Sequence, residues 1–591
     1  MIKLSVLVTF CKQKDFIQRA LDSIFMQKTD FEYEVLIGLD GECAESEQII
    51  NSYCEKHHNA HLHKIDNSGI DIINIEKASK NRLNLLARAQ GKYICFLDGD
   101  DCYCSDKRFQ TLVDILDDNY NIIAVCHDYK IYDYKTGTYT SRKHKFGTVE
   151  QLVCAKDYII KPPHLQYSCW IYRNIFLGTV PNDFNSRFLN DSTFIYYMLK
   201  YGDFYYVPDE MLAYTINIQS IYNSLDNDLQ LAYAFLASEE NYKTQYAYHR
   251  ELCKKYKKNL KKLFKLRNKI QKHQDCKKII NFAKEDGCYF TYSILNYNNL
   301  SLISKVELMF NMFLYYYFNW YKLDIKVKKL LYFNGVPNFG DQLNLYVIQR
   351  LLNIQIRKEK ASKCDLLAIG SYLQQIIGKK KKQRTITIWG TGFIKPVEKK
   401  RKIKLTRNIK VLALRGKLSV QELQKFNVKN LGKVPLGDSG LLSSYLYQIQ
   451  PSKKYKVGII LHYVDKNSVY IKNIKLPDYK LIDVNENPMW ILKEISECDV
   501  IFSSAMHGLI AADSLNIPNQ QIILSNKIVG GLFKYKDYYS IFAETPNPID
   551  LRKRYLTEDD VISLKNNYRS DNKKEQIKMI SKRLLDCAKY I

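Results

Sequence analysis

Two stretches of this chain alternate short apolar runs with helical patterns, and this alternation is the strongest constraint on its fold. Such a pattern is typical of βαβ units on a parallel sheet. In the first stretch we expect strands and helices at Leu4–Thr9, Asp15–Met26, Tyr33–Leu39, Tyr93–Leu97 and Asp106–Leu116. With 591 residues, the chain is too long for one compact core, because domains average roughly 100–200 residues.

The second stretch begins at Lys328. We expect its strands at Leu330–Phe333, Leu366–Ile369, Thr385–Trp389, Val411–Leu414, Val457–Leu461 and Val500–Phe502. A glycine or small polar residue follows each one, as in doubly wound α/β folds. The sequence therefore predicts an α/β chain with domains at 1–250 and 328–591, joined by a basic and aromatic helical linker at 251–327 and ending in a charged helical tail.

The predicted linker holds two unusual segments. Between Lys254 and Lys272 there are ten basic residues and no acidic one, with leucines at near-helical spacing. This pattern predicts a basic amphipathic helix, which suits either a solvated face or an anionic membrane or polyanionic acceptor. The aromatic run Phe310–Tyr321 is too short to span a bilayer, and it fits either packing between domains or a helix in the lipid headgroups.

The chain is strongly basic, with 89 Lys and Arg against 62 Asp and Glu, which gives a net charge of +27. An anionic partner would explain this charge, and so would a coding bias toward lysine. The aromatic residues are not interleaved with basic ones as a stacking platform, and we find no nucleic-acid motif. We therefore expect no nucleic-acid partner.

The cysteine pattern bears on the cellular compartment in which we expect the protein. Fifteen cysteines occur without a Cys-x-x-Cys motif, and the only close pair is Cys102 and Cys104. This indicates neither a disulfide framework nor a zinc site. The N-terminus begins directly as a strand, without the features of a signal peptide, and no apolar run reaches the length of a membrane span. We expect a cytoplasmic protein.

The first candidate site lies in the segment Gly91-Lys-Tyr-Ile-Cys-Phe-Leu-Asp98-Gly-Asp100-Asp101. Here an apolar strand ends in clustered carboxylates, at the end where open α/β sheets bind ligands. Asp98 and Asp100 could converge on Mg²⁺ or Mn²⁺ and, through it, on a diphosphate. Thr9 and Asp40 end two further predicted strands. The alternative is that such acidic turns are ordinary solvent-exposed turns, which have the same residue types.

Together, "VTF", the Asp40 turn, "AQGKYICFLDGDD" and "NDSTFIYYMLKYGDFYYV" resemble the family-2 glycosyltransferases over roughly residues 3–225. The resemblance implies a GT-A fold with a Rossmann-like mixed sheet and sugar transfer, with inversion, from a nucleotide-sugar donor. Thr9 would lie in the donor site, Asp98 and Asp100 would hold the metal and diphosphate, and Asp40 would contact the nucleoside.

Asp191 would be the general base of that reaction. An alternative is that Asp191 only caps the helix that it opens. The chain also departs from the family after the strand Phe204–Val207. Members often continue Tyr-Arg-x-His, whereas this chain has Tyr214-Thr215-Ile216-Asn217. Because of this departure, the sequence determines neither the sugar donor nor the contacts of that loop with a metal.

The second candidate site begins with Asn338-Phe339-Gly340-Asp341, where a glycine would let backbone amides approach an anion at a helix N-terminus. Similar glycine junctions recur at Gly390-Thr391-Gly392 and at Arg415-Gly416. His507 follows a buried strand within "SSAMHGL", beside small residues that leave space. It could donate a proton to a ligand, or it could be a packing or capping histidine.

The ordered blocks "NFGDQLN", "IGSYL", "WGTGF", "LALRG", "LGDSG" and "SSAMHGLIAADSL" resemble the polysaccharide pyruvyl transferases over about residues 329–540. The resemblance implies a two-lobed fold similar to GT-B and metal-independent transfer from phosphoenolpyruvate to sugar hydroxyls, forming a ketal. His507 would be the acid. The donor would be bound by Asn338, Gly340, Asp341, Gly390, Gly392 and Arg415, with Lys534 or Lys536 as helpers. Ala505 stands where many members carry arginine, so another cation would have to replace that side chain, and Arg415 is the first choice. Arg415 could instead be an ordinary residue at the start of a helix.

These resemblances predict a bifunctional enzyme of bacterial surface polysaccharide biosynthesis, such as that of capsule or lipopolysaccharide. One domain would add a sugar and the other a pyruvyl ketal to a glycan or lipid-linked glycan. The basic helix near residue 260 would then allow peripheral contact with the inner face of the cell membrane. The alternative is two glycosyltransferase domains, the second using a nucleotide sugar.

Overall fold

The computed structural model describes residues 2–11, 14–41, 43–67, 69–141, 146–161, 165–177, 179–181, 183–185, 187–216, 225–319, 321, 323–333, 335–378, 384–398, 403–448, 453–568 and 570–591. The chain forms two compact units, Met1–Ile325 and Lys326–Ile591. We describe each unit separately.

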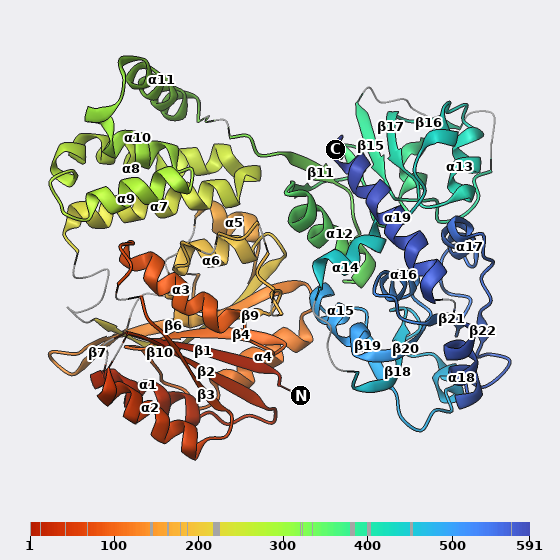
Figure 1. The fold of residues 1–591 in the computed structure, drawn as a ribbon, viewed down its shortest axis with the longest axis horizontal. Helices are drawn as coiled ribbons and strands as arrows, with labels where there is room; N and C mark the ends of the chain where they lie inside the picture. Colours follow the sequence, from red (N-terminus) through yellow and green to blue (C-terminus); the bar gives the residue numbers. More distant parts are fainter. Residues whose placement is uncertain are drawn as a thin grey trace. The chain divides into compact units, whose positions relative to one another are not determined.

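A mixed sheet is the centre of the first unit (Figure 1). Its main strands follow the order β3-β2-β1-β4-β9-β6-β10-β5. These strands are β1 (Leu4–Phe10), β2 (Tyr33–Asp40), β3 (Ala60–Ile65), β4 (Tyr93–Asp98), β5 (Cys102–Tyr103), β6 (Ile122–Asp133), β9 (Trp170–Arg173) and β10 (Asp203–Ile216), with β7 (Thr138–Ser141) and β8 (Gln151–Val153) beside them. The first four are parallel, and β9 is antiparallel to both β4 and β6. The predicted mixed α/β sheet is confirmed.

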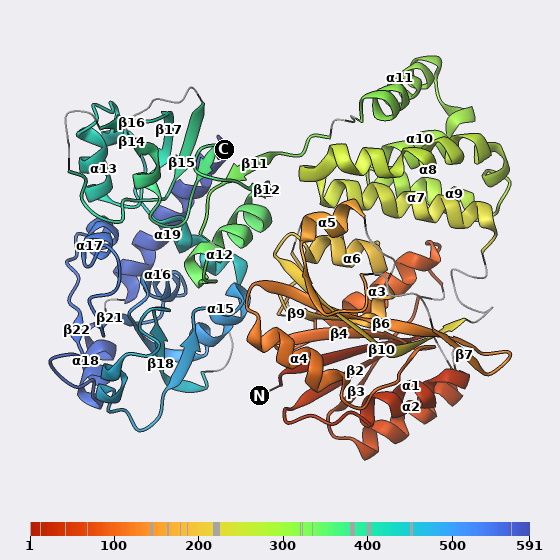
Figure 2. The ribbon, with the colours of Figure 1, turned by 180° about the vertical axis from the view of Figure 1, so that it is seen from behind.

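Helices cover both faces of this sheet. In Figures 1 and 2, α1 (Lys14–Phe25) and α2 (Ala44–Lys56) lie on one side of the sheet, and α3 (Asn74–Leu86) lies on the other. The apolar face of α1 buries Phe16, Ile17, Leu21 and Ile24, the spacing expected of an amphipathic helix. The remaining helices of this part are α4 (Arg108–Asp118), α5 (Ala155–Ile160) and α6 (Asp191–Met198).

A helical layer completes the first unit. It consists of α7 (Asn227–Thr244), α8 (His249–Ile270), α9 (Cys276–Glu285), α10 (Tyr289–Leu295) and α11 (Leu302–Phe318). The basic amphipathic helix predicted here is α8, and its buried side includes Leu252, Tyr256, Leu260 and Leu263. Most of the segment that we expected to be a linker therefore packs as part of this unit. None of the described helices is long and apolar enough to cross a bilayer.

Two parallel sheets form the lobes of the second unit, in the orders β12-β11-β13-β15-β17 and β19-β18-β20-β21-β22. The first comprises β11 (Val327–Leu330), β12 (Gln355–Lys358), β13 (Leu366–Leu367), β15 (Thr385–Trp389) and β17 (Asn408–Ala413). The second comprises β18 (Tyr455–Leu461), β19 (Lys480–Asp483), β20 (Cys498–Ser503), β21 (Asn519–Ile523) and β22 (Ile549–Asp550). The predicted α/β class is confirmed, but the strand expected at Leu330–Phe333 was wrong, because the pairing residues precede Leu331.

The lobes carry helices α12 (Phe339–Tyr346), α13 (Lys417–Gln424), α14 (Ser443–Leu446), α15 (Pro488–Ser496), α16 (Met506–Ser514), α17 (Phe533–Tyr539), α18 (Glu558–Asn567) and α19 (Ser570–Ala588). The last of these, α19, follows the second lobe in sequence but packs on β17 of the first (Figure 2). The indole nitrogen of Trp389 donates a hydrogen bond to the Leu584 carbonyl at 3.0 Å. The charged helical tail thus connects the two lobes.

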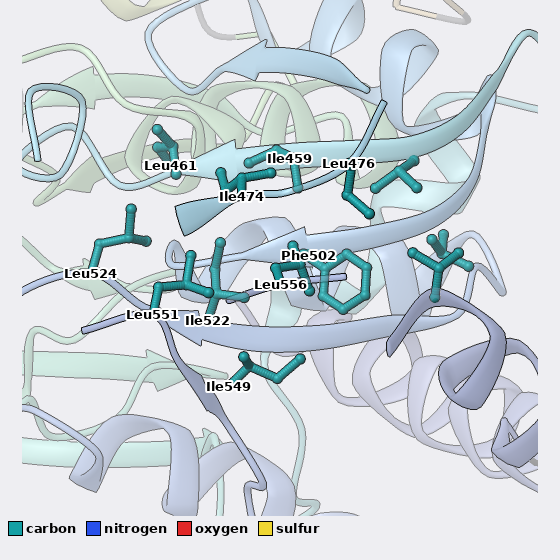
Figure 3. Packing of buried hydrophobic residues seen from close by; sticks show 13 residues of the cluster. Ile459, Leu461, Ile474, Leu476, Phe502, Ile522, Leu524, Ile549, Leu551 and Leu556 are labelled. Atoms are coloured by element: carbon teal, nitrogen blue, oxygen red, sulfur yellow. The ribbon is translucent and has the colours of Figure 1, made fainter. Parts of the chain in front are cut away.

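Alternate residues of the second sheet build its core, as Figure 3 shows. Val457 and Ile459 of β18 lie directly opposite Val500 and Phe502 of β20. Because side chains alternate along a strand, these residues share one face of the sheet. Leu524 joins the same cluster and is fully buried.

We expect Leu524→Ala to lower the free energy of unfolding of the second unit by about 2–5 kcal/mol, because it leaves a cavity in this core. Leu481→Ala is the matched control, since Leu481 lies in β19 of the same sheet with 54% of its surface exposed. Its effect should stay within about 0.5 kcal/mol. Urea unfolding followed by tryptophan fluorescence measures both, and equal effects would contradict this account of the core.

Candidate active sites

Three predicted side chains of the first unit lie where parallel strands end. Thr9 of β1 pairs in register with Asp98 of β4, and Asp40 is the last residue of the neighbouring β2. The Gly99 amide donates a hydrogen bond to the Thr9 carbonyl at 3.1 Å, so the turn that carries Asp100 starts at this edge. The sheet therefore brings these residues to its carboxyl edge, as expected of an open α/β sheet.

The acidic turn accumulates negative charge in a partly buried position. Burial and the charge of Asp98 raise the pKa of Asp100 to about 6. Asp101 is buried and accepts hydrogen bonds from the Thr215 amide (2.9 Å) and the Ser168 hydroxyl (3.2 Å), so it fixes the turn. A divalent cation would relieve the repulsion between Asp98 and Asp100, and carboxylate oxygens suit Mg²⁺ or Mn²⁺. The chemistry of these two carboxylates fits such an ion, and their contact with a metal stays a prediction.

Arg82 of α3 joins this turn to the loop before α6. One of its terminal nitrogens lies 2.6 Å from Asp98 Oδ1, and the other donates to the Leu189 carbonyl at 3.0 Å. The charges of Asp98 and Asp191 raise the pKa of the guanidinium. Sequence analysis missed Arg82, because it resembles its basic neighbours on the helix and only the fold brings it to Asp98.

Asp191 is the first residue of α6, but it is not the N-cap. Asn190 caps the helix by accepting hydrogen bonds from the amides of Ser192 and Thr193. The alternative in which Asp191 is the cap was therefore wrong. Its carboxylate lies close enough to Arg82 to act on the pKa of that side chain. The predicted role of Asp191 as the general base stays a prediction.

Asp40 has a local partner in the structure. Its two carboxylate oxygens accept hydrogen bonds from the amide and the side chain of Asn67, both at 3.1 Å. The predicted contact between Asp40 and a nucleoside stays a prediction. Of the residues that depart from the family pattern, Thr215 is buried beside Asp101, whereas Asn217 lies outside the described residues.

A cavity of about 240 Å³ lies between the two lobes of the second unit. It contains the predicted site residues Asn338, Gly340, Asp341, His507 and Lys534. Helices α12 and α16 both begin at this cavity, so their N-terminal ends face the same space. The positive ends of two helix dipoles and one lysine therefore favour an anion here.

His507 lies at the start of α16, with 16% of its side chain exposed. Burial, with the charges of Lys534 and Arg415, lowers the pKa of His507 to about 3. Its Nε2 lies 3.8 Å from Asp438 Oδ2, and neither atom has a hydrogen-bond partner among the described residues. Burial raises the pKa of Asp438 to about 7. The imidazole is thus neutral in the empty cavity, with a carboxyl group ready to pair with its charged form.

Gly340 leaves the space that this imidazole occupies. A Cβ atom at position 340 would lie 2.0 Å from His507 Nδ1, well inside contact distance. The neighbouring Asp341 accepts hydrogen bonds from the Asn338 amide group at 2.6 Å and from the Tyr372 hydroxyl. Burial raises the pKa of Asp341 to about 6.

His462 and Lys534 complete the polar lining. Burial and the charge of Lys534 lower the pKa of His462 to about 4. Its Nδ1 accepts a hydrogen bond from the Val464 amide at 3.3 Å, so the neutral ring carries its proton on Nε2. Burial and Arg415 lower the pKa of Lys534 to about 8. Sequence analysis missed His462 and Tyr372, although a histidine directly after an apolar strand was a usable signal for the first.

Arg415 does not line the cavity, contrary to what a direct donor contact requires. Its guanidinium is fully buried, pairs with Asp537 at 3.0 Å, and donates to the Ser371 hydroxyl at 2.6 Å and to the Phe393 carbonyl. Asp537 pairs with the charged guanidinium of Arg415. Arg415 therefore reaches the cavity only through its hydrogen bond to Ser371, which is part of the cavity lining. Lys536 is exposed and also lies outside the cavity lining.

Gly390 and Gly392 lie outside the cavity lining and pack against residues near it. A Cβ at 392 would lie 2.5 Å from the Arg415 guanidinium carbon. Gly390 has a φ of 82° and packs against Ser439. Both glycines are therefore explained by close packing, and their predicted contact with a donor stays a prediction.

Comparisons with known proteins find two families along the chain. A profile of the glycosyl transferase family 2 matches residues 5–189, and a profile of the polysaccharide pyruvyl transferases matches residues 236–519. The chain fuses these two domains. The first match contains Thr9, Asp40, Asp98 and Asp100, and the second contains most of the cavity lining, including His507.

Individual relatives are distant. The uncharacterized protein L143 of Acanthamoeba polyphaga mimivirus is 27% identical over 234 residues, which cover 38% of this chain and 77% of that protein. Structures of S. aureus TarS 1-349 in complex with UDP and with UDP-GlcNAc are 15% identical, with TM-scores of 0.31 and 0.33, and cover 50% of this chain and 92% of theirs.

The first unit also contains, among its described residues, a group of side chains that could ligate a metal, formed by Glu240, Asp286 and Cys288. Lys243 Nζ lies 2.6 Å from Glu240 and 2.8 Å from Asp286, so a lysine already supplies the positive charge. We assign no metal to this group.

We expect Gly340→Ala to displace the His507 ring of the pyruvyl transferase domain, because the added methyl group occupies its position. Gly432→Ala is the matched control, since no atom lies within 4 Å of the position of its Cβ. The His507 ring signal in a ¹³C spectrum should shift only in the first variant. An unmoved ring signal in Gly340→Ala would contradict the packing described here.

Sulfate, a dianion at every pH used, should raise the pKa of His507 from its value of about 3. The reason is that a bound anion stabilises the imidazolium. Between about pH 8 and 5 the ring should therefore stay neutral in chloride and begin to protonate in sulfate of equal ionic strength. Histidine NMR measures this, with a His507→Gln variant to assign the signal among 11 histidines. Identical titration in both salts would argue against an anion site.

Proposed function

We propose that this chain is a bifunctional enzyme of surface polysaccharide biosynthesis, which adds a sugar with its first unit and a pyruvyl ketal with its second. The supporting observation is the cavity of the second unit, where two helix N-termini, Lys534 and two neutral imidazoles face one space. A cavity that binds an uncharged ligand would not need two helix N-termini, a lysine and two imidazoles. A small dianion or trianion such as phosphoenolpyruvate suits all of them.

In the first unit, Asp98 and Asp100 would hold Mg²⁺ or Mn²⁺, which supplies charge neutralisation for a departing nucleotide diphosphate. Asp40 would bind the nucleoside. Asp191 would take the proton of the acceptor hydroxyl, on the face opposite the leaving group, and this geometry inverts the anomeric carbon. Arg82 fixes the Asp98 carboxylate and lies near Asp191, so we assign it the role of positioning the two halves of the site.

In the second unit, the phosphate and carboxylate of the donor would lie against the starts of α12 and α16. Lys534 would pair with one of these groups, and His462 would donate from Nε2. The Arg415–Asp537 pair would act indirectly, by holding Ser371 at the cavity. An arginine at position 505 is thus replaced by Lys534 and by helix dipoles rather than by Arg415.

Proton transfer would begin once the donor is bound, because its negative charge raises the pKa of His507. His507 then protonates the terminal carbon of the enol, which becomes a methyl group, and Asp438 stabilises the imidazolium. Two acceptor hydroxyl oxygens bond to the central carbon as the bond to the phosphate oxygen breaks. One hydroxyl proton restores His507 and the other leaves with the phosphate, so the reaction balances as a ketal plus inorganic phosphate.

Incubation of the full chain with a defined glycan and either phosphoenolpyruvate or a panel of nucleotide sugars tests this proposal. We expect phosphate release and an acidic mass gain with phosphoenolpyruvate, and a hexose-type mass gain with one nucleotide sugar. If the second unit instead used a nucleotide sugar, phosphoenolpyruvate would release no phosphate. That result would replace our proposal with two sugar transfers.

Single substitutions should separate the two activities. Asp100→Asn removes a candidate metal ligand and should reduce sugar transfer by at least about a hundredfold, while pyruvyl transfer is unchanged. His507→Ala should do the reverse, because it removes the acid. Chelation of divalent ions should inhibit only sugar transfer.

Asp30→Asn is the control for the first variant, since Asp30 is exposed in the same unit. Loss of both activities in either site variant, with normal circular dichroism, would contradict the assignment of one reaction to each unit.

A further inference from the structure

Helix α11 of the first unit carries an exposed apolar stripe. Residues at helical spacing along one side of it are Leu302, Val306, Met309, Phe310, Phe313 and Tyr317, with exposed fractions between 48% and 79%. Side chains spaced three and four residues apart share one helix face. A continuous stripe of this kind on a soluble surface marks an interaction site.

The opposite side of α11 is firmly packed. Leu308 and Tyr315 are buried, and the ring of Tyr315 meets that of Phe290 in α10 edge-to-face at 5.2 Å. Ser301 caps the helix by accepting a hydrogen bond from the Ser304 amide. The stripe is thus held outward by a well-anchored helix, at the edge of the helical layer in Figures 1 and 2.

Basic side chains of α8 border the stripe. The amino groups of Lys257 and Lys261 lie 5.4 and 5.7 Å from the ring of Tyr316, which is on α11. The exposed lysines on α8 are Lys254, Lys258, Lys261, Lys262, Lys265 and Lys269, of which Lys269 pairs with Asp228 at 2.8 Å. No acidic residue occurs between Lys254 and Lys272. An apolar stripe therefore lies beside a dense cationic face.

We propose that α11 and α8 together form a docking surface for an anionic lipid membrane. Helix α11 has 17 residues, so it is about 26 Å long and would lie in the plane of the interface. Its apolar stripe would enter the boundary between headgroups and acyl chains. The lysines of α8 would then contact lipid phosphates, each adding to the affinity for negatively charged lipid.

Charge favours lipid over a second copy of this chain as the occupant. A two-fold pairing of this surface would bring the same lysine-rich face against itself, and like charges repel. An anionic bilayer satisfies both the stripe and the lysines at once. The proposal for this surface does not depend on either proposed reaction, because the surface contains none of the residues assigned to them.

Sedimentation of the full chain with vesicles tests the surface. We expect binding to vesicles of phosphatidylcholine with phosphatidylglycerol, and weak binding to phosphatidylcholine alone. Phe310→Ser with Phe313→Ser should weaken binding at least about tenfold, because two aromatic rings leave the bilayer. Lys257→Gln with Lys261→Gln should weaken binding to the anionic vesicles by about thirtyfold.

Val469→Ser with Leu481→Ser is the control for the aromatic pair, since both residues are exposed apolar residues of the second unit. Its binding should equal that of the natural chain. Circular dichroism checks that each variant folds. Wild-type binding by the Phe310/Phe313 variant, or equal binding to neutral and anionic vesicles, would overturn the proposal.

Sedimentation velocity without lipid identifies the competing occupant. A dimer that the Phe310/Phe313 variant dissociates would assign the stripe to a second copy and overturn the proposal. A monomer in both cases is the expected result.

Discussion

Parallel strand pairing is the constraint on which both candidate sites depend. Parallel strands end at one edge, so residues distant in sequence meet there without any direct attraction between them. In the first unit this edge joins Thr9 to Asp98. In the second, β18 and β20 are neighbours, and the histidines that follow them, His462 and His507, reach one cavity. The chemistry of each site is therefore a consequence of sheet topology.

The candidate sites of the two units differ in the charges of their side chains. In the first, Asp98 and Asp100 are close enough that burial and repulsion raise the pKa of Asp100, and Arg82 neutralises only part of the charge. In the second, burial and Arg415 lower the pKa of Lys534, two imidazoles stay neutral, and burial raises the pKa of Asp341 to about 6. We therefore propose a cation for the first site and an anion for the second. This difference is the physical reason for assigning a metal to the first site alone.

Local sequence predicted the parts of each site that follow directly from a strand end. Asp98, Gly340 and His507 were recognisable because an apolar run, a turn and a helix pattern surround them. Arg82 and Tyr372 were not, because they reach their sites through contacts with Asp98 and Asp341 that no local pattern encodes. Arg415 is a similar case, since its partner Asp537 lies 122 residues away and holds the guanidinium outside the cavity lining. The fold class followed from periodicity, whereas long-range polar pairs did not.

The helical layer shows why sequence families and folding units need not share boundaries. The pyruvyl transferase match begins at residue 236, inside α7, yet α7 and α8 pack against each other within the first unit. Leu252, Tyr256 and Leu260 turn the apolar side of α8 inward, and removing the layer would expose that side to water. The basic side of the same helix then has to face outward. Burial of the apolar face of α8 therefore directs its lysines outward and forms the cationic surface beside α11. The same packing thus stabilises the first unit and sets the charge of its outer layer.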